Sequence, residues 1–255
     1  MTTTRTIAFV LYPGLTALDF VGPLQVISGL QELGLGFETV TVAAARQPLP
    51  TDSPVCVTAS HTFEQVPAPY GLVVPGGGAP TFAALADEQL TGYVRQAAGG
   101  AEVVASVCTG SLILGAGGLL EGREAVTHWA AMPILRAFGA TPVSRRWVAD
   151  GRVLTAAGVA AGIDMALHLV TELVGEDAAR MIQAAAAAAR PDRLGPRGPR
   201  VHGVRDQVGG REGPGRPSGV ARPPRYGRRD PERVPLRLRA RSSMSRARRP
   251  AVTAP

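Results

Sequence analysis

Short apolar segments alternate with segments of helical spacing through the first 190 residues of this 255-residue chain. The strand-like segments cover 6–11, 37–43, 55–58, 71–74, 102–107, 147–148 and 153–155. The helical segments cover 17–33, 80–98, 109–120, 130–138, 162–174 and 176–189. An Asp-Gly pair at 150–151 predicts a hairpin between the last two strands. This order predicts an α/β fold, a mostly parallel sheet sandwiched by helices in the flavodoxin-like manner.

The composition changes abruptly near Arg190. Residues 1–190 carry 10 Arg against 15 acidic residues, whereas residues 191–255 carry 17 Arg against 5, together with half of the 22 prolines. The second segment has no strand or helix periodicity and too few large apolar residues to order itself. We therefore expect an α/β catalytic domain in 1–190 and an Arg/Pro/Gly-rich, disordered tail in 191–255.

The role of the basic tail stays open at this point. A basic segment can contact nucleic acid or acidic partners, although a solvated segment without a specific partner is the commoner case. The tail also lacks the apolar periodicity of a helix-turn-helix domain, so we expect no specific nucleic-acid binding. The abrupt change also allows the hypothesis of a reading-frame shift near codons 184–190, and sequencing the gene tests it.

Composition also favours a reducing compartment. No run of 18 apolar residues appears, and the N-terminal apolar run closes at 12–14 without a small-residue cleavage site. The two cysteines, Cys56 and Cys108, form no C-x-x-C pair, and no cluster of His, Cys and Asp has metal-ligand spacing. We expect a cytoplasmic protein with no disulfide, no membrane contact and no metal.

Cys108 lies where an apolar strand runs into a helix, in the segment VVASVCTGS (103–111). This is the layout of a nucleophile elbow, which presents a reactive side chain at the carboxyl end of a sheet. The helix N-terminus is expected to lower the pKa of the thiol and to raise the fraction of reactive thiolate. The pattern alone does not separate this interpretation from a buried structural cysteine.

A glycine loop and two titratable residues accompany this elbow. The run PGGG (75–78) ends another strand, and the N–H groups of Gly77 and Gly78 are predicted to face an oxyanion, although such a loop is often only a turn. Asp19 has apolar neighbours and follows the first strand, so it is predicted to meet Cys108 as a general acid or base with a raised pKa. The alternative is an Asp that only stabilises a helix N-terminus. His128 is the remaining base candidate, with a packing histidine as its alternative.

The sequence resembles the PfpI-like family, whose members have a class I glutamine-amidotransferase-like fold. The resemblance covers residues 5–183 and is greatest to the isonitrile hydratases within that family. It rests on ALDFVGPLQV (17–26), VVPGGG (73–78), SVCTGSLILGAGGLLEGREAVTHW (106–129) and GIDMALHLV (162–170). The combination of Cys-Thr-Gly with a following Thr-His-Trp makes it specific.

The resemblance implies a hydro-lyase that converts isonitriles to N-substituted formamides, acting as a homodimer without a cofactor. It implies that Cys108 is the nucleophile and that Asp19 and Thr109 are the other residues tied to activity. Many PfpI-type proteins carry His after the cysteine, whereas this chain has Thr109, so a protease-like Cys–His pair is not expected. Two alternatives remain: glyoxalase- or deglycase-like chemistry on small aldehydes, and a non-catalytic sensor domain related to AraC-type regulators.

Overall fold

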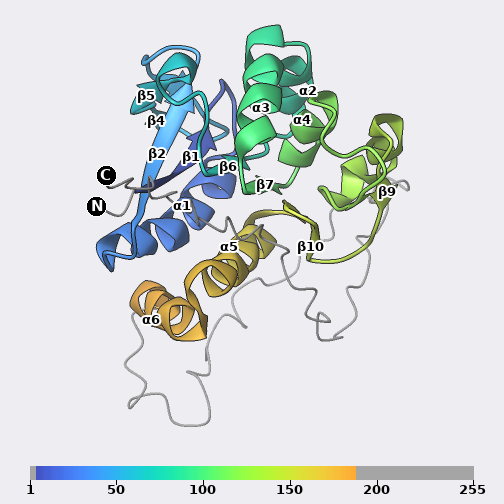
Figure 1. Cartoon of the computed structure of the whole chain (residues 1–255). Helices are drawn as coiled ribbons and strands as arrows, with labels where there is room; N and C mark the ends of the chain where they lie inside the picture. Colours follow the sequence, from blue (N-terminus) through green and yellow to red (C-terminus); the bar gives the residue numbers. More distant parts are fainter. Residues whose placement is uncertain (1–3, 188–255) are drawn as a thin grey trace, which may run out of the picture.

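A seven-stranded sheet forms the centre of the computed structural model, which describes residues 4–187 (Figure 1). The predicted tail, 191–255, therefore lies outside the described residues. The strand order is β10-β11-β7-β6-β1-β2-β5. The strands are β1 (Arg5–Val10), β2 (Phe37–Ala43), β5 (His61–Thr62), β6 (Gly71–Val74), β7 (Val103–Val107), β10 (Trp147–Asp150) and β11 (Val153–Ala156).

All pairs of neighbouring strands in this sheet are parallel except β10 and β11. The antiparallel pair is joined by a turn at Gly151 and Arg152, directly after Asp150, and Gly151 has a φ of +64°. The α/β class and this hairpin are confirmed. The predicted strand 55–58 instead becomes β4 (Cys56–Val57), which pairs with β3 (Leu49–Pro50) outside the central sheet.

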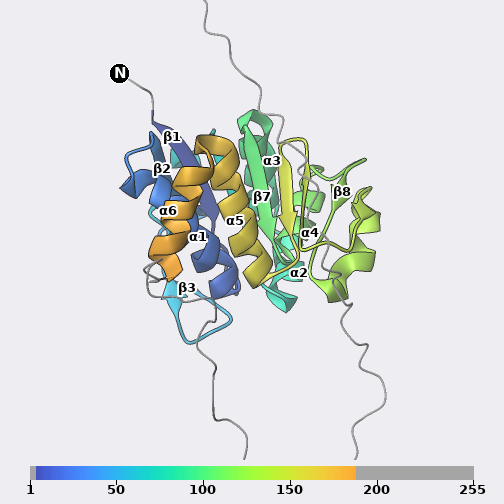
Figure 2. The ribbon, with the colours of Figure 1, turned by 90° about the horizontal axis from the view of Figure 1, so that it is seen from below.

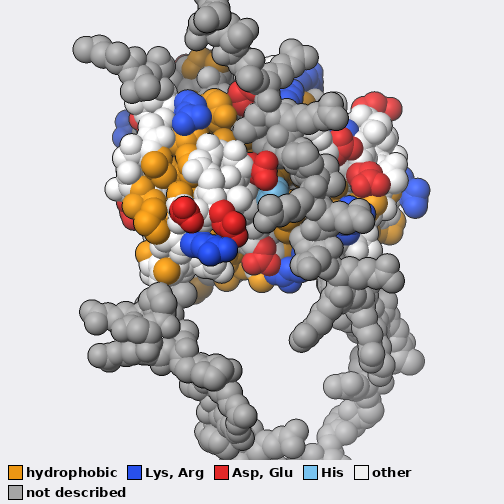
Figure 3. Space-filling model, turned by 60° about the horizontal axis from the view of Figure 1, so that its bottom comes forward, with side chains coloured by type: hydrophobic (Ala, Val, Ile, Leu, Met, Phe, Trp, Pro, Cys, Tyr) orange, Lys and Arg blue, Asp and Glu red, His pale blue; other side chains and the backbone are white. Residues whose placement is uncertain are grey.

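Helices cover both faces of the sheet (Figures 1 and 2). One face carries α1 (Ala17–Glu32), α5 (Val159–Val174) and α6 (Glu176–Ala187), and the other carries α2 (Ala79–Leu85), α3 (Glu88–Gly100) and α4 (Gly110–Ala116). The remaining elements are η1 (Phe63–Gln65), β8 (Glu124–Ala125), η2 (Trp129–Phe138) and β9 (Thr141–Pro142). Within residues 4–187, no helix is long and apolar enough to span a membrane. Hydrophobic side chains gather on part of the lower face (Figure 3).

Two of the predicted helices differ from the structure because of local signals. The helix predicted over 80–98 is two helices, because the side chain of Asp87 accepts a hydrogen bond from the N–H of Leu90 at 3.0 Å and begins α3. The segment predicted as helical over 130–138 forms η2, a 3₁₀ helix that contains Pro133, which cannot donate a backbone hydrogen bond.

β7 lies between β6 and β11 and is buried along its whole length. Val104, Ala105 and Val107 are all fully buried, as expected for a parallel strand that has helices on both sides. The strand ends at the carboxyl edge of the sheet, directly before Cys108. The packing around β7 therefore fixes the position of the cysteine.

A substitution at Gly162 tests how closely α5 packs on β7. A Cβ atom at this position would lie 2.8 Å and 2.9 Å from the two methyl carbons of Val107. We expect Gly162→Ala to lower the free energy of unfolding by about 1–3 kcal/mol, measured by urea denaturation. Gly92 in α3 is the control, because its Cβ would meet nothing within 4 Å. Gly92→Ala should instead raise stability by about 0.5–1 kcal/mol, and a shared direction of change would contradict the packing argument.

Candidate active site

Cys108 occupies a strained turn between β7 and α4. Its φ is +56°, and among residues 4–187 it is the one non-glycine residue with a positive φ. Its N–H donates to the carbonyl of Ala156 at 2.8 Å, and its carbonyl accepts from the Thr127 hydroxyl at 2.9 Å and the Ser111 hydroxyl at 3.3 Å. These contacts hold the cysteine in the left-handed region, which is costly for a residue with a side chain.

Two glycines allow the chain to approach this turn closely. A Cβ at Gly110 would overlap the carbonyl oxygen of Val74, so α4 can begin beside β6 only with glycine there. A Cβ at Gly76 would lie 2.8 Å from the Cβ of Cys108 and 2.9 Å from Oδ2 of Asp19. Gly76 is therefore the residue of the PGGG run that touches both functional side chains, and a run of three glycines gives no signal to single it out.

The first turn of α1 brings Asp19 against Cys108. Asp19 is fully buried, and neither carboxyl oxygen has a partner with hydrogen-bond geometry within residues 4–187. Burial raises the pKa of Asp19 to about 6, and the adjacent Cys108 thiol and Gly76 N–H oppose this shift. The position of both residues at strand ends predicted that Asp19 and Cys108 meet, and the structure places them together. The pKa of Asp19 is also shifted upward, in the predicted direction.

A second carboxylate, Asp52, holds the helix that carries Asp19. Asp52 Oδ1 accepts from the N–H of Ala17 at 2.9 Å, and the Asp52 N–H donates to the carbonyl of Leu15 at 3.0 Å. The N-cap residue Thr16 makes no side-chain capping bond, so Asp52 performs this role from a distant loop. Its negative charge adds to the rise in the Asp19 pKa. Sequence reasoning missed Asp52, because nothing in the β3–β4 loop indicates where it docks.

The Cys108 thiol differs from the prediction of an acidic cysteine. Burial raises the pKa of Cys108 to about 12, and the charge of Asp19 contributes to the rise. Donors on Thr109 oppose the shift, but α4 has only seven residues and its N-terminus does not outweigh the other effects. The expectation of a lowered thiol pKa is therefore wrong. Near neutral pH, the thiol holds its proton and the Asp19 carboxylate lies beside it as the acceptor.

Thr109 belongs to a buried chain of hydroxyls. Its Oγ1 accepts from the N–H of Gly77 at 3.1 Å and lies 2.7 Å from Oγ1 of Thr81. Thr81 Oγ1 lies 3.3 Å from Oη of Tyr12, and Tyr12 donates to the carbonyl of Pro75 at 3.0 Å. Thr81 and Tyr12 carry no motif, and sequence reasoning missed both.

The glycines predicted to face an oxyanion have different surroundings. The amide of Gly77 is engaged by Thr109, so in this arrangement it does not face a substrate, in contrast to the prediction. Gly78 is exposed, with a φ of +54°, and stands at the N-cap of α2. Its role as an oxyanion donor stays a prediction.

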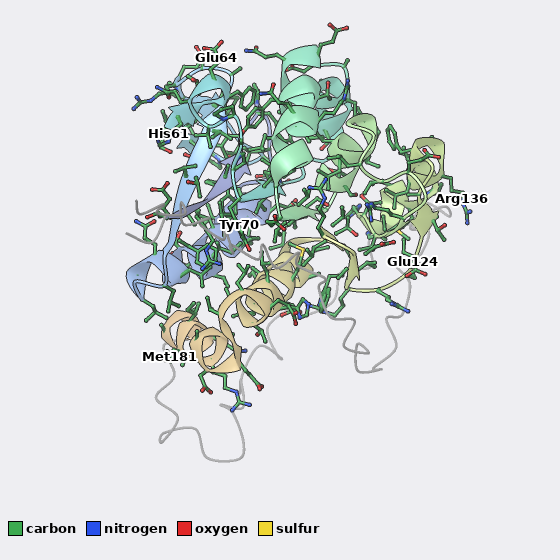
Figure 4. All side chains as sticks on the ribbon, in the orientation of Figure 1. His61, Glu64, Tyr70, Glu124, Arg136 and Met181 are labelled. Atoms are coloured by element: carbon green, nitrogen blue, oxygen red, sulfur yellow. The ribbon has the colours of Figure 1, made fainter. Side chains whose placement is uncertain are left out.

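Within residues 4–187, no hydrogen bond or ring contact joins a histidine to Cys108 or Asp19. His128 stands at the N-cap of η2 with its ring tilted against Trp129, and it is not among the groups that shift the pKa of Cys108. His61 lies at β5, far from β7 in the sheet order (Figure 4). His168 stacks on Trp147 with ring centroids 4.3 Å apart. Across the described part of the chain, no three His, Cys, Asp or Glu side chains gather as a metal site.

Comparison with known proteins shows that the chain is similar to both an enzyme and a transcriptional regulator. The DJ-1/PfpI family model matches residues 5–172. Isonitrile hydratase of Pseudomonas putida is 41% identical over 177 residues, which are 69% of this chain and 75% of that protein. A THiJ/PfpI family protein from Pseudomonas syringae, of known structure, has a TM-score of 0.70 at 34% identity and covers 76% of this chain and 78% of its own. The HTH-type transcriptional regulator CdhR of Pseudomonas aeruginosa is 26% identical over 66% of this chain and 50% of the regulator.

Proposed function

The chain belongs to the DJ-1/PfpI family, and from this premise we propose that it hydrates isonitriles to N-substituted formamides through Cys108. One observation carries the proposal: the buried Asp19 carboxyl lies against a thiol on a strained elbow. A proton acceptor beside a protonated nucleophile suits a substrate whose carbon must gain both a sulfur and a proton. The 41% identity to an isonitrile hydratase supports this substrate class.

The first half of the reaction adds the S–H group across the isonitrile carbon. The Asp19 carboxylate accepts the thiol proton while Sγ of Cys108 bonds to the terminal carbon. The resulting Asp19 carboxyl then gives this proton to the same carbon, which leaves a thioimidate, R–N=CH–S–Cys. The carboxyl has a pKa of about 6, so it can both accept and return a proton near neutral pH.

The second half adds water and releases the sulfur. The Asp19 carboxylate accepts a proton from water as the water oxygen bonds to the thioimidate carbon, and it then gives this proton to the nitrogen. The C–S bond breaks as Asp19 takes the proton of the new hydroxyl group, this proton passes to Sγ, and the product is R–NH–CHO. Thr109, whose donors favour the charged form of Cys108, stabilises the sulfur as it leaves. Overall, one isonitrile and one water give one formamide.

The pH dependence of the reaction follows from Asp19. Its pKa of about 6 places the reactive carboxylate above that pH, so kcat/KM should rise about tenfold per pH unit below 6 and level off above it. Rates with an alkyl isonitrile between pH 4.5 and 8.5 measure this profile. A Cys108→Ala sample at each pH subtracts uncatalysed acid hydrolysis. A rate that falls as pH rises through 6 would contradict the base role.

Product analysis tests the proposed activity against its alternatives. The purified protein is incubated with cyclohexyl isocyanide and, separately, with methylglyoxal. Formation of N-cyclohexylformamide supports hydration, whereas lactate from methylglyoxal alone would favour glyoxalase-like chemistry, in which the thiol forms a hemithioacetal. Absence of both products would contradict an enzyme of either type.

A sensor role is a second candidate because the similarity to CdhR spans most of the described chain. In that case the site at Cys108 binds a small molecule without converting it. A ligand that binds only the folded state raises the melting temperature, so a sensor should show this rise with an isonitrile while no formamide forms. Turnover would exclude a purely sensory role.

The family resemblance also implies an oligomeric state and a cellular location for the protein. We propose a cytoplasmic homodimer, and light scattering on the purified protein tests the dimer. A monomer at micromolar concentration would contradict it.

A further inference from the structure

The Thr-His-Trp segment at 127–129 makes the sequence resemblance specific, yet the proposed reaction uses none of its side chains. Thr127 is fully buried, and its hydroxyl donates to the carbonyl of Cys108 at 2.9 Å from a position 19 residues further along the chain. A buried hydroxyl that reaches the backbone of the nucleophile itself is suited to holding the reactive side chain in place.

Two hydrogen bonds hold the backbone of Cys108, one on each side of its Cα atom. Its N–H belongs to the peptide unit before Cα and donates to the carbonyl of Ala156 at 2.8 Å. Its carbonyl belongs to the peptide unit after Cα and accepts from Thr127. Because each peptide unit is planar, φ and ψ are the only soft rotations between the two units. Holding both units therefore sets φ and ψ of Cys108, and with them the direction of the Cα–Cβ bond that carries the thiol.

Both partners are attached to β11, so they hold Cys108 against the same strand. Ala156 is the last residue of β11. The Oγ1 of Thr155 in that strand accepts from the N–H of Val126 at 3.0 Å, and both of these residues are buried. Val126 directly precedes Thr127 in the chain. The Thr127 hydroxyl is thus held in place relative to the sheet by a contact that is not part of the elbow.

Ser111 is less able to fix the same carbonyl. Its hydroxyl donates to the Cys108 carbonyl at 3.3 Å, which is longer than the usual O–H···O distance of about 2.7–2.8 Å. Ser111 also lies three residues after Cys108 in α4, so it belongs to the segment whose position must be fixed. The φ of +56° at Cys108 is costly for a residue with a side chain, and an elbow without an outside contact is free to relax. The Thr127 hydroxyl opposes this relaxation.

We propose that Thr127 is a positioning residue for Cys108: its hydroxyl holds the Cys108 carbonyl and so keeps the thiol beside the Asp19 carboxyl. The effect on turnover rests on the proposed function, because the thiol must reach both Asp19 and the isonitrile carbon. The effect on the conformation of Cys108 does not rest on any substrate.

Nuclear magnetic resonance of protein that contains ¹³C-labelled cysteine tests this proposal without an isonitrile. All variants carry Cys56→Ser, so the label reports Cys108 alone. The Cα and Cβ chemical shifts of a residue depend on its φ and ψ. Thr127→Val keeps the shape of the side chain and removes the donor, so we expect both Cys108 signals to move from their parent positions. Thr127→Ser keeps the donor and should return both signals to the parent positions.

Turnover of cyclohexyl isocyanide gives the second measurement. Thr127→Val should lower kcat about 10- to 100-fold, because a small displacement of the nucleophile disturbs the reacting geometry, and should change KM by less than about twofold. Thr127→Ser should keep kcat within about threefold of the parent. Thr127→Ala also lacks the donor but packs differently, so it repeats the test if the valine variant folds poorly.

Thr91→Val is the matched control. Thr91 is also a buried threonine, and its hydroxyl donates to the carbonyl of Asp87 at 2.9 Å, but this bond lies within α3. The control loses a hydrogen bond of the same kind, so it should lower the midpoint of urea denaturation while the Cys108 signals and kcat stay at parent values.

Three outcomes would overturn the role of Thr127. The first is parent-like Cys108 signals and kcat in folded Thr127→Val or Thr127→Ala. The second is a Thr127→Ser variant that differs from the parent as much as Thr127→Val does. The third is an equal change of signals and kcat in Thr91→Val, because a general loss of stability would then explain the effect.

The two proposals fail in different ways. A parent protein that forms no formamide, while Thr127→Val moves the Cys108 signals and Thr127→Ser restores them, would contradict isonitrile hydration and support the role of Thr127. Formamide formation with parent-like kcat and signals in all Thr127 variants would do the reverse.

Discussion

Replacement of Cys108 by alanine is expected to abolish formamide formation, with a fall in kcat of about 10⁴-fold or more. The reason is that the proposed thioimidate requires a sulfur bonded to the substrate carbon, and no other thiol can supply it. Cys56, the other cysteine, is exposed and lies on β4, outside the central sheet. Gas chromatography of the formamide from cyclohexyl isocyanide measures the loss. Cys56→Ser is the matched control and should keep full activity.

A glycine at position 108 separates the chemistry from the backbone strain. Cys108 has a φ of +56°, which glycine adopts freely and alanine does not. Cys108→Gly should therefore be inactive like Cys108→Ala, yet more stable than it by about 1 kcal/mol in urea denaturation. Parent-like turnover in either variant would exclude Cys108 as the nucleophile. Equal stability of the two would show that the elbow is not strained in solution.

The sequence predicted the fold because its evidence is local and repeated. A uniformly apolar strand such as Gly71–Val74 is typical of a parallel sheet that has helices on both faces. The Asp150–Gly151 pair is a local signal for the hairpin between β10 and β11. The break at Asp87 was missed because the helical apolar spacing continues across it. One capping side chain decides the break there, and its effect does not show in periodicity.

The site was predictable in its main residues but not in its electrostatics. The strand-to-helix pattern predicted the elbow at Cys108, and the strand ends predicted that Asp19 approaches it. The pKa of the thiol was predicted in the wrong direction, because burial and the Asp19 charge come from segments far apart in the chain. Thr81 and Asp52 carry no local signal either, because each is hydrogen-bonded to a residue that lies far away in the sequence.

Asp19→Asn is expected to remove activity and to stabilise the protein at the same time. Without the carboxylate, no group beside the thiol accepts its proton, so kcat/KM should fall by about 10²–10⁴-fold. The stability effect follows from the pKa of Asp19, which rises from 3.8 to about 6 on folding. A charged carboxylate in a buried site destabilises the folded state, and removing it should raise the free energy of unfolding by about 1–3 kcal/mol at pH 8.

The size of this stability effect depends on pH in a way that identifies its cause. Above pH 6, the carboxylate is charged in both the folded and the unfolded chain, so the folded state bears the whole cost of burying it. Below 3.8, the carboxyl is neutral in both states and the cost is absent. The advantage of Asp19→Asn should therefore be full at pH 8 and largely gone near pH 4, as measured by urea denaturation at both values.

Asp52→Asn provides the matched control for this experiment. It keeps an oxygen to cap α1 at Ala17 but removes the second negative charge, so it should shift the pH midpoint of activity below that of the parent without abolishing turnover. If Asp19→Asn were less stable than the parent at pH 8, the carboxylate would be a structural group instead. A variant that is both more stable and inactive would show that the protein keeps a destabilising charge at this position for its chemistry.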